Sequence, residues 1–111
     1  MSELLEKQQK FAAMLPQLIN AAIQKGYEVT LGECLRTQAQ ATANAAAGTG
    51  ISNSLHLDRL AIDLNLFRAG QFLTATSDYA PLGLYWESIG GTWGGRFNDG
   101  NHFSLAYGGR K

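Results

Sequence analysis

Both histidines of the chain lie close to aspartates, and these residue types together can hold a metal ion. Asp63 follows His56 by seven residues, and Asp99 precedes His102 by three. Two imidazoles and one carboxylate bind a tetrahedral zinc ion and leave its fourth position open for a reacting water. We therefore interpret His56, Asp63 and His102 as ligands of one zinc ion. Asp99 is then the carboxylate that handles the proton of the water.

Each of these residues also has an ordinary structural explanation. A single histidine is more often a hydrogen-bonded surface or core residue than a ligand, and an Asp-Gly-Asn sequence is common in tight turns. Asp63 is harder to explain in this way, because it stands in an apolar segment and a buried carboxylate is costly unless it is paired or coordinated. Spacing alone leaves both interpretations open.

The pattern of apolar residues predicts an α+β fold, with a mainly antiparallel sheet flanked by about three helices. Residues 60–66 alternate as a strand does, with leucine and isoleucine on one face and Asp63 on the other. We expect His56 in the loop that leads into this strand. His102 is expected to begin a later strand, and Asp99 to lie in the turn before it. The four residues can meet in such an arrangement.

The other elements follow from periodicity and from capping residues. An apolar row with Gln8 as its polar member predicts a helix over residues 3–25, with Ser2 as N-cap and Gly26 as stop. We further expect a strand at 27–31, a helix from Thr37 to about Gly48 and a short strand near 72–73. A helix should then run from Ser77 or Asp78 to Ile89, with Pro81 in its first turn. The last two expected strands lie at Trp93 and at 102–107 and are joined by a tight turn at 98–101.

Composition bounds the class of protein. The 111 residues predict a single domain, 1–111, and nine basic residues balance nine acidic ones. We therefore expect no nucleic-acid partner, and nothing requires more than a monomer. No apolar run is long enough for membrane insertion, and the acidic N-terminus lacks the features of a signal peptide. The protein is expected to stay in a host cytoplasm until it is released to act on its substrate.

The sequence around the candidate ligands resembles a known family. The S-x-H-x(6)-D pattern that begins at Ser54, the W-G-G sequence at 93–95 and the D-x-x-H-F sequence at 99–103 closely resemble the LAS-type zinc peptidases of peptidoglycan. This family contains VanY-type D-alanyl-D-alanine carboxypeptidases and phage L-alanyl-D-glutamate endopeptidases. The resemblance spans residues 31–103 and implies that His56, Asp63 and His102 bind zinc and that Asp99 is the catalytic base.

The same resemblance implies two substrate contacts. Arg36-Thr37 matches the R-[S/T] pair whose arginine lies near the substrate's carboxylate, and a guanidinium binds carboxylates through two parallel hydrogen bonds. Ser54 occupies the family's usual serine position before the first ligand. One departure is Arg59, which stands where the family commonly has glycine. A second is the aspartate base, since the carboxypeptidases typically use glutamate; aspartate resembles the phage endopeptidases.

These features favour a zinc peptidase that cuts the peptide stem of peptidoglycan as a phage or prophage endolysin. A carboxypeptidase is the alternative within the family. Another enzyme class would use Cys34 as nucleophile with a histidine as base, although Cys34 lacks flanking motifs and is interpreted as a small buried residue. A third possibility is a non-catalytic phage structural or wall-binding protein of the same fold. Trp86 and Trp93 are expected in the core.

Overall fold

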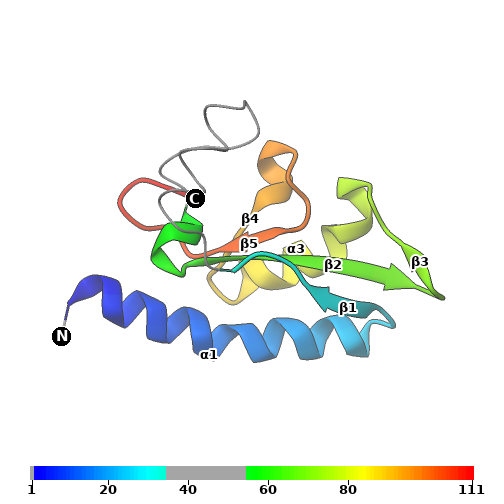
Figure 1. The fold of residues 1–111 in the computed structure, drawn as a ribbon, viewed down its shortest axis with the longest axis horizontal. Helices are drawn as coiled ribbons and strands as arrows, with labels where there is room; N and C mark the ends of the chain where they lie inside the picture. Colours follow the sequence, from blue (N-terminus) through cyan, green and yellow to red (C-terminus); the bar gives the residue numbers. More distant parts are fainter. Residues whose placement is uncertain (1, 35–54) are drawn as a thin grey trace.

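The computed structural model describes residues 2–34 and 55–111 (Figure 1). The predicted helix from Thr37, together with Arg36 and Ser54, lies outside the described residues. The helices and strands, in chain order, are α1 (Glu3–Gln24), β1 (Glu28–Leu31), the 3-10 helix η1 (Leu55–Asp58), β2 (Ala61–Arg68), β3 (Gln71–Phe72), the 3-10 helix η2 (Thr76–Tyr79), α3 (Ala80–Ser88), β4 (Thr92–Trp93), the 3-10 helix η3 (Gly94–Phe97) and β5 (His102–Ser104).

An antiparallel sheet forms the centre of the molecule, which confirms the predicted α+β class. Its strands follow the order β1-β2-β5-β4, and β3 also pairs with β2. Strand β2 buries Ile62, Leu64 and Leu66, whereas Asp63 and Asn65 of the opposite face are only partly buried. Period-two alternation therefore places Asp63 on the face away from the apolar side chains, as predicted.

Helix α1 runs along the apolar side of the sheet (Figure 1). The hydroxyl of Ser2 accepts a hydrogen bond from the amide of Leu5 at 3.1 Å, and Gly26 ends the helix region with a φ of 88°. The side-chain amide of Gln8 donates to the carbonyl of Asp58 at 2.8 Å. The one polar residue in the apolar row thus connects α1 to the segment that carries His56.

One apolar core joins the helices to the sheet. Phe11 and Leu18 of α1, Leu82 and Trp86 of α3, and Phe103 of β5 belong to one buried cluster. The ring of Trp86 makes edge contacts with Phe11 at 5.9 Å and with Phe103 at 6.3 Å between centroids. Among the described helices, none is long and apolar enough to cross a membrane.

Two predicted elements differ in detail from the structure. The predicted tight turn at residues 98–101 lies between the paired strands β4 and β5, but the 3-10 helix η3 precedes it, so the connection is longer than predicted. Asn98 adopts a left-handed φ of 61°, and the amide of Asp99 donates to the carbonyl of Gly94 at 2.9 Å, which closes a longer connection than a two-strand turn needs. The helix predicted from Ser77 begins as 3-10 helix η2 and continues as α3.

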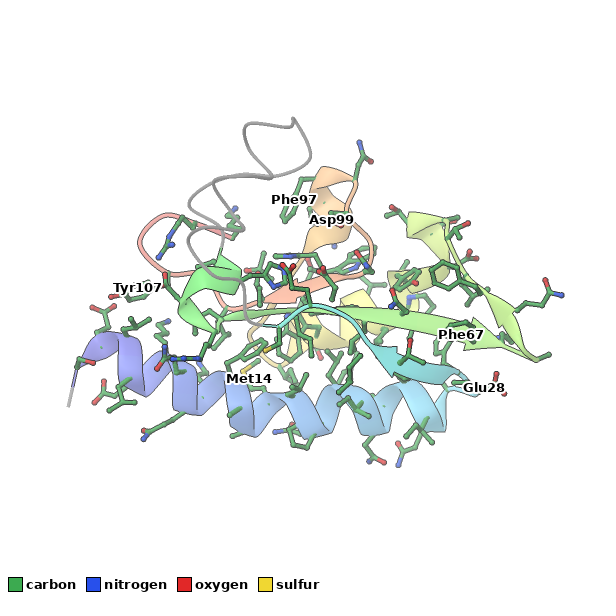
Figure 2. All side chains as sticks on the ribbon, viewed as in Figure 1. Met14, Glu28, Phe67, Phe97, Asp99 and Tyr107 are labelled. Atoms are coloured by element: carbon green, nitrogen blue, oxygen red, sulfur yellow. The ribbon has the colours of Figure 1, made fainter. Side chains whose placement is uncertain are left out.

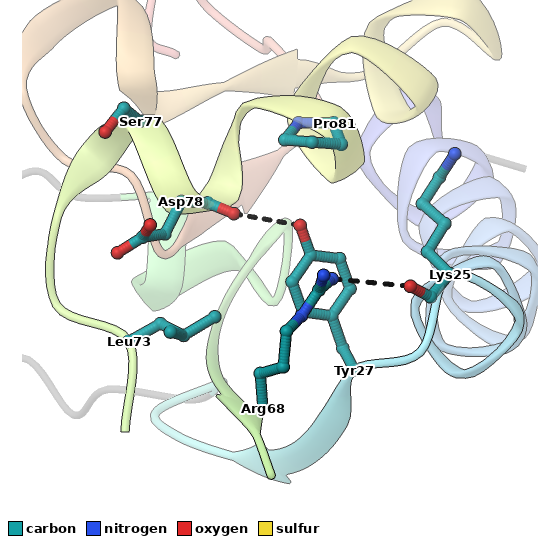
Figure 3. Close-up of a pocket in the computed structure, with 7 residues that line it drawn as sticks. All are labelled: Lys25, Tyr27, Arg68, Leu73, Ser77, Asp78 and Pro81. Atoms are coloured by element: carbon teal, nitrogen blue, oxygen red, sulfur yellow. Dashed lines mark hydrogen bonds between the residues drawn. The ribbon is translucent and has the colours of Figure 1, made fainter. Parts of the chain in front are cut away.

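The end of the sheet farthest from His56 contains a cavity of about 530 Å³ (Figure 3). The guanidinium of Arg68 lies 4.4 Å from the centre of the Tyr27 ring and donates to the carbonyl of Lys25 at 3.3 Å. The Tyr27 hydroxyl donates to the carbonyl of Asp78 at 3.0 Å. These contacts fasten the end of α1 to β2 and η2, so the polar groups of this cavity have structural roles.

Candidate metal centre

Three candidate ligands converge from separate elements. His56 lies in η1, Asp63 lies in the middle of β2, and His102 is the first residue of β5. Asp63 and His102 are direct partners in the antiparallel pairing of β2 and β5. One ligand atom from each of the three side chains lies within 4.8 Å of the other two. The fold therefore brings together residues that are up to 46 positions apart in the sequence.

The distances between these atoms suit a small tetrahedral cation. His56 Nε2 lies 3.4 Å from Asp63 Oδ1, which in turn lies 3.8 Å from His102 Nδ1. Metal–ligand bonds of about 2.0–2.2 Å in tetrahedral geometry separate ligand atoms by about 3.3–3.6 Å. The donor set of two imidazoles and one carboxylate also matches the preferences of zinc. The residues present therefore fit a zinc ion.

The orientation of His56 is fixed through its other nitrogen. Nδ1 lies 3.2 Å from the carbonyl oxygen of Cys34 and 3.8 Å from Oε1 of Glu33. A carbonyl oxygen can only accept a hydrogen bond, so Nδ1 must carry the proton and donate it. The lone pair of Nε2 then points toward the carboxylate of Asp63, and two electron-rich atoms 3.4 Å apart require a proton or a cation between them.

The carboxylates around the two imidazoles affect each differently. Burial disfavours the charged form of His56, but the hydrogen bond and negative charge of Asp63 outweigh it, and the pKa of His56 is raised. Burial lowers the pKa of His102; the charge of Asp99 opposes this and the nearby His56 reinforces it. The centroids of the His56 and His102 rings are 5.5 Å apart. Two imidazoles so close together cannot easily both be protonated, whereas a shared cation satisfies both.

Both backbone polar groups of Asp63 are hydrogen-bonded to the segment that follows β1. The amide of Gly32 donates to the carbonyl of Asp63 at 2.7 Å, and the amide of Asp63 donates to the carbonyl of Glu33 at 2.9 Å. A Cβ at Gly32 would lie 2.9 Å from the same carbonyl oxygen, so this approach requires glycine. The segment after β1 therefore positions Asp63 through its backbone and His56 through the Cys34 carbonyl.

Asp99 lies beside His102 and remains accessible. Its Oδ2 atom is 3.9 Å from His102 Nδ1, and half of its side chain, 51%, is exposed. Figure 2 shows Asp99 and Phe97 on the opposite side of the sheet from Met14 of α1. The Phe97 ring makes an edge contact with His102 at 5.6 Å and is itself 46% exposed. Asp99 can thus meet both a ligand and a molecule from solvent.

The turn that carries Asp99 is packed without spare room. A Cβ added to Gly94 would lie 2.2 Å from the carbonyl oxygen of Asp99 and 2.6 Å from the Cβ of His102. The indole nitrogen of buried Trp93 donates to the carbonyl of Gly100 at 2.8 Å. Trp86 and Trp93 are both buried, as predicted, and Trp93 also connects the core to this turn.

Sequence reasoning missed several residues of this region. The W-G-G motif contained Gly94, but its role depends on contacts with Asp99 and His102 that the motif alone does not reveal. Glu33 belongs to none of the motifs, and Phe97 lies between two of them without being part of either. Arg36 and Ser54 lie outside the described residues, so their substrate contacts stay predictions.

The thiol of Cys34 lacks the environment of a catalytic nucleophile. Burial raises its pKa, although the charge of Arg59 partly opposes this effect. A raised pKa reduces the fraction of reactive thiolate at neutral pH. The contact between Cys34 and His56 goes through the backbone carbonyl. The described geometry therefore favours the metal centre over a cysteine nucleophile.

The antiparallel sheet and the three converging side chains define a small α+β protein with a candidate metal centre. A family model described as D-alanyl-D-alanine carboxypeptidase matches residues 47–105, more than half of the chain. The chain belongs to this family of LAS-type peptidases, and it is a peptidase.

Among solved structures, the chain is similar to the L-Ala D-Glu endopeptidase ChiX of Serratia marcescens. The two share 23% sequence identity with a TM-score of 0.70, over 95% of this chain and 87% of that one. At this identity the likeness establishes a shared fold. No match was found among curated proteins.

Proposed function

We propose that the chain is a zinc-dependent peptidase that hydrolyses the peptide stem of bacterial peptidoglycan. The observation that carries this proposal is that one ligand atom from each of His56, Asp63 and His102 lies within 4.8 Å of the other two, with the Asp99 carboxylate 3.9 Å from His102 Nδ1. In this proposal His56, Asp63 and His102 hold one zinc ion, and Asp99 is the catalytic base. Residues 1–111 act as one zinc peptidase domain.

The chain's own residues account for proton transfer in this reaction. A zinc ion bound by the three ligands would polarise the scissile carbonyl and lower the pKa of the attacking water. The accessible carboxylate of Asp99 takes the proton of that water and passes it to the leaving amine. The turn held by Gly94 and Trp93 keeps this carboxylate near His102 while the substrate binds.

We further propose that the bond cut is that between L-alanine and D-glutamate, in a phage or prophage endolysin that acts on the wall after release from the host cytoplasm. Two features support this proposal: the residue that we assign as base is an aspartate, as in the phage endopeptidases that the sequence resembles, and the fold is similar to that of an L-Ala D-Glu endopeptidase. The second candidate is a D-alanyl-D-alanine carboxypeptidase, which the family description favours.

The test is digestion of purified peptidoglycan by the zinc-loaded protein, the chelated protein and the Asp99→Asn variant, followed by mass spectrometry. We expect the zinc-loaded wild type to release the stem beyond its first L-alanine, and the other two to release almost nothing. Release of free D-alanine would show that the protein is a carboxypeptidase and not an endopeptidase. Full activity of the metal-free protein would refute the zinc mechanism.

Asp99→Asn also separates catalysis from a wall-binding role. The variant keeps the shape of the side chain but cannot accept the proton, so it should bind zinc as the wild type does. If the wild type binds peptidoglycan and yields no more products than Asp99→Asn, the protein is the non-catalytic alternative instead.

A further inference from the structure

The segment that follows β5 turns back toward η1, the 3-10 helix that carries His56 (Figure 1). Tyr107 and Arg110 pair through their backbones, each amide donating to the other carbonyl at 3.0 Å. Gly108 and Gly109 between them have positive φ values of 58° and 78°, which such a turn requires. A Cβ at Gly109 would meet nothing within 4 Å, so the backbone pairing, and not the tip of the turn, places Arg110.

The side chain of Arg110 connects this turn to η1. Its guanidinium lies 5.9 Å from the centre of the Tyr107 ring and donates a hydrogen bond to the carboxylate of Asp58, with which it forms an ion pair. The side chains of Arg110 and Asp58 are only 26% and 24% exposed. Water therefore screens this pair less than a pair on the open surface, and removal of one partner would leave the other charge poorly compensated.

Asp58 is the last residue of η1 and follows the candidate ligand His56 by two positions. A 3-10 helix of four residues has poor internal hydrogen-bond geometry, so its position depends on the elements that contact it. Asp58 is held twice, since its carbonyl accepts from the side-chain amide of Gln8 at 2.8 Å and its carboxylate pairs with Arg110. Two separate segments thus fix the helix turn from which the imidazole of His56 projects.

We propose that Arg110 is a positioning residue of the metal centre, which acts through its ion pair with Asp58 to hold η1 and therefore His56. The inference rests on the proposed function, in which His56 binds zinc. His56 Nε2 lies 3.4 Å from Asp63 Oδ1, and metal–ligand distances tolerate changes of only about 0.2 Å. Without the pair, zinc binding must itself order η1, and this cost lowers the affinity although all three ligands are present.

The test is competition for zinc between a chromophoric chelator and two variants, Arg110→Gln and Asp58→Asn. We expect each variant to bind zinc about fivefold more weakly than the wild type, a smaller loss than the roughly tenfold or more that follows removal of a direct partner of a ligand. The measurement is made at a temperature at which circular dichroism shows every variant to be folded. Asp58→Asn keeps the shape of the side chain, so it tests the inference even if Arg110→Gln does not fold.

Arg68→Gln is the matched control. Arg68 also lies over a tyrosine ring, that of Tyr27 at 4.4 Å, and also holds a distant segment, through the carbonyl of Lys25 (Figure 3). It does so at the end of the sheet farthest from His56. Its replacement should lower the free energy of unfolding, as Arg110→Gln does, but should leave zinc affinity unchanged.

Two further measurements separate positioning from general stabilisation. If Arg110 and Asp58 act as a pair, the double variant should bind zinc no more weakly than either single variant, and Arg110→Lys, which keeps the charge, should recover part of the affinity. With cobalt in place of zinc, the visible absorption spectrum reports the geometry of the ligands. This spectrum should change in Arg110→Gln and not in Arg68→Gln.

The results distinguish this inference from the proposed function. If Arg110→Gln and Asp58→Asn bind zinc as tightly as the wild type, or if Arg68→Gln weakens zinc binding as much as they do, Arg110 only stabilises the fold and the inference is wrong. If the wild type binds no zinc and cleaves no peptidoglycan, the proposed function itself is wrong.

Discussion

The imidazole of His56 and the backbone carbonyl of Cys34 lie 3.2 Å apart, and this contact orients the ring toward Asp63. The carbonyl belongs to the same short segment whose backbone also pairs with Asp63. Two of the three candidate ligands therefore depend on one piece of chain, Gly32–Cys34. Because a carbonyl cannot lose its acceptor capacity by mutation of a side chain, the adjustable partner of His56 is the carboxylate of Glu33, 3.8 Å from Nδ1.

Glu33→Gln is expected to weaken zinc binding by about tenfold, because a carboxylate near the outer nitrogen of a ligating histidine makes that histidine a stronger ligand. Competition with a chromophoric chelator measures the affinity. Glu6→Gln, on the exposed side of α1, is the matched control and should leave the affinity unchanged. Equal affinities of Glu33→Gln and the wild type would show that the carbonyl of Cys34 alone determines the ligand strength of His56.

Zinc should raise the melting temperature of the wild type, since a ligand that binds only the folded chain stabilises it. At a free zinc concentration one hundred times the dissociation constant, the free energy of unfolding rises by about 2.7 kcal/mol. Asp63→Ala should abolish the zinc-dependent shift, which thermal unfolding with and without the ion measures. A shift of undiminished size in Asp63→Ala would place the zinc elsewhere in the protein.

Gly94→Ala should reduce both kcat and zinc affinity. The new methyl group would collide with the carbonyl of Asp99 and the Cβ of His102, and the turn must move to accommodate it. A displacement of about 1 Å at a catalytic group costs on the order of 100-fold in rate. Overpacking should also lower the free energy of unfolding by about 1–3 kcal/mol. Kinetics and chemical denaturation on the same sample measure both effects, and an unaltered kcat would contradict the proposed role of the turn.

Arg59→Gly should stabilise the protein by about 0.5–1 kcal/mol. Arg59 adopts a left-handed φ of 58°, which strains a residue with a Cβ but not glycine, and the greater flexibility of unfolded glycine offsets part of the gain. Ala69→Gly, at a φ of 52°, is the matched control and should give a similar gain in urea unfolding. Destabilisation by Arg59→Gly alone would indicate that the arginine side chain makes contacts that outweigh its backbone strain.

Cys34→Ala should retain zinc binding and peptidase activity. The thiol is partly buried with a raised pKa, and the contribution of Cys34 to the site comes from its backbone carbonyl. Activity assays and metal analysis of the variant are sufficient to check this. Loss of activity with full zinc content would instead support the cysteine nucleophile.

The candidate ligands could be predicted from the sequence because the motifs around them resemble a known family, whereas their spacing alone left both interpretations open. Alternation along β2 alone places Asp63 opposite the leucines, and this face is the one that meets His102. The long helix was equally predictable, since its cap, apolar row and glycine stop are all local signals. Gln8, the polar residue in the apolar row of α1, has a specific partner as well, the carbonyl of Asp58.

The rest of the site depends on contacts between distant segments. Glu33 reaches His56 only because β1 pairs with β2 and its continuation passes the metal centre. The close approach of Gly100 to Thr76 joins residues 24 positions apart, and no periodicity in either segment indicates that they touch. The turn between β4 and β5 could be predicted because Asn98 and Gly100 suit tight turns, whereas nothing in the sequence marked the 3-10 helix η3 that precedes this turn.

The direct pairing of Asp63 with His102 makes the alignment of two strands a requirement of the chemistry. A shift of either strand by a single position would turn one of these side chains to the opposite face of the sheet. Inserting one residue between Asn98 and Asn101 should therefore cost the protein its metal while leaving most of its core intact. The same insertion at the exposed Gly108–Gly109 turn should be tolerated. During evolution, length variation in this enzyme is expected to be confined to segments outside the β2–β5 ladder and its connecting turn.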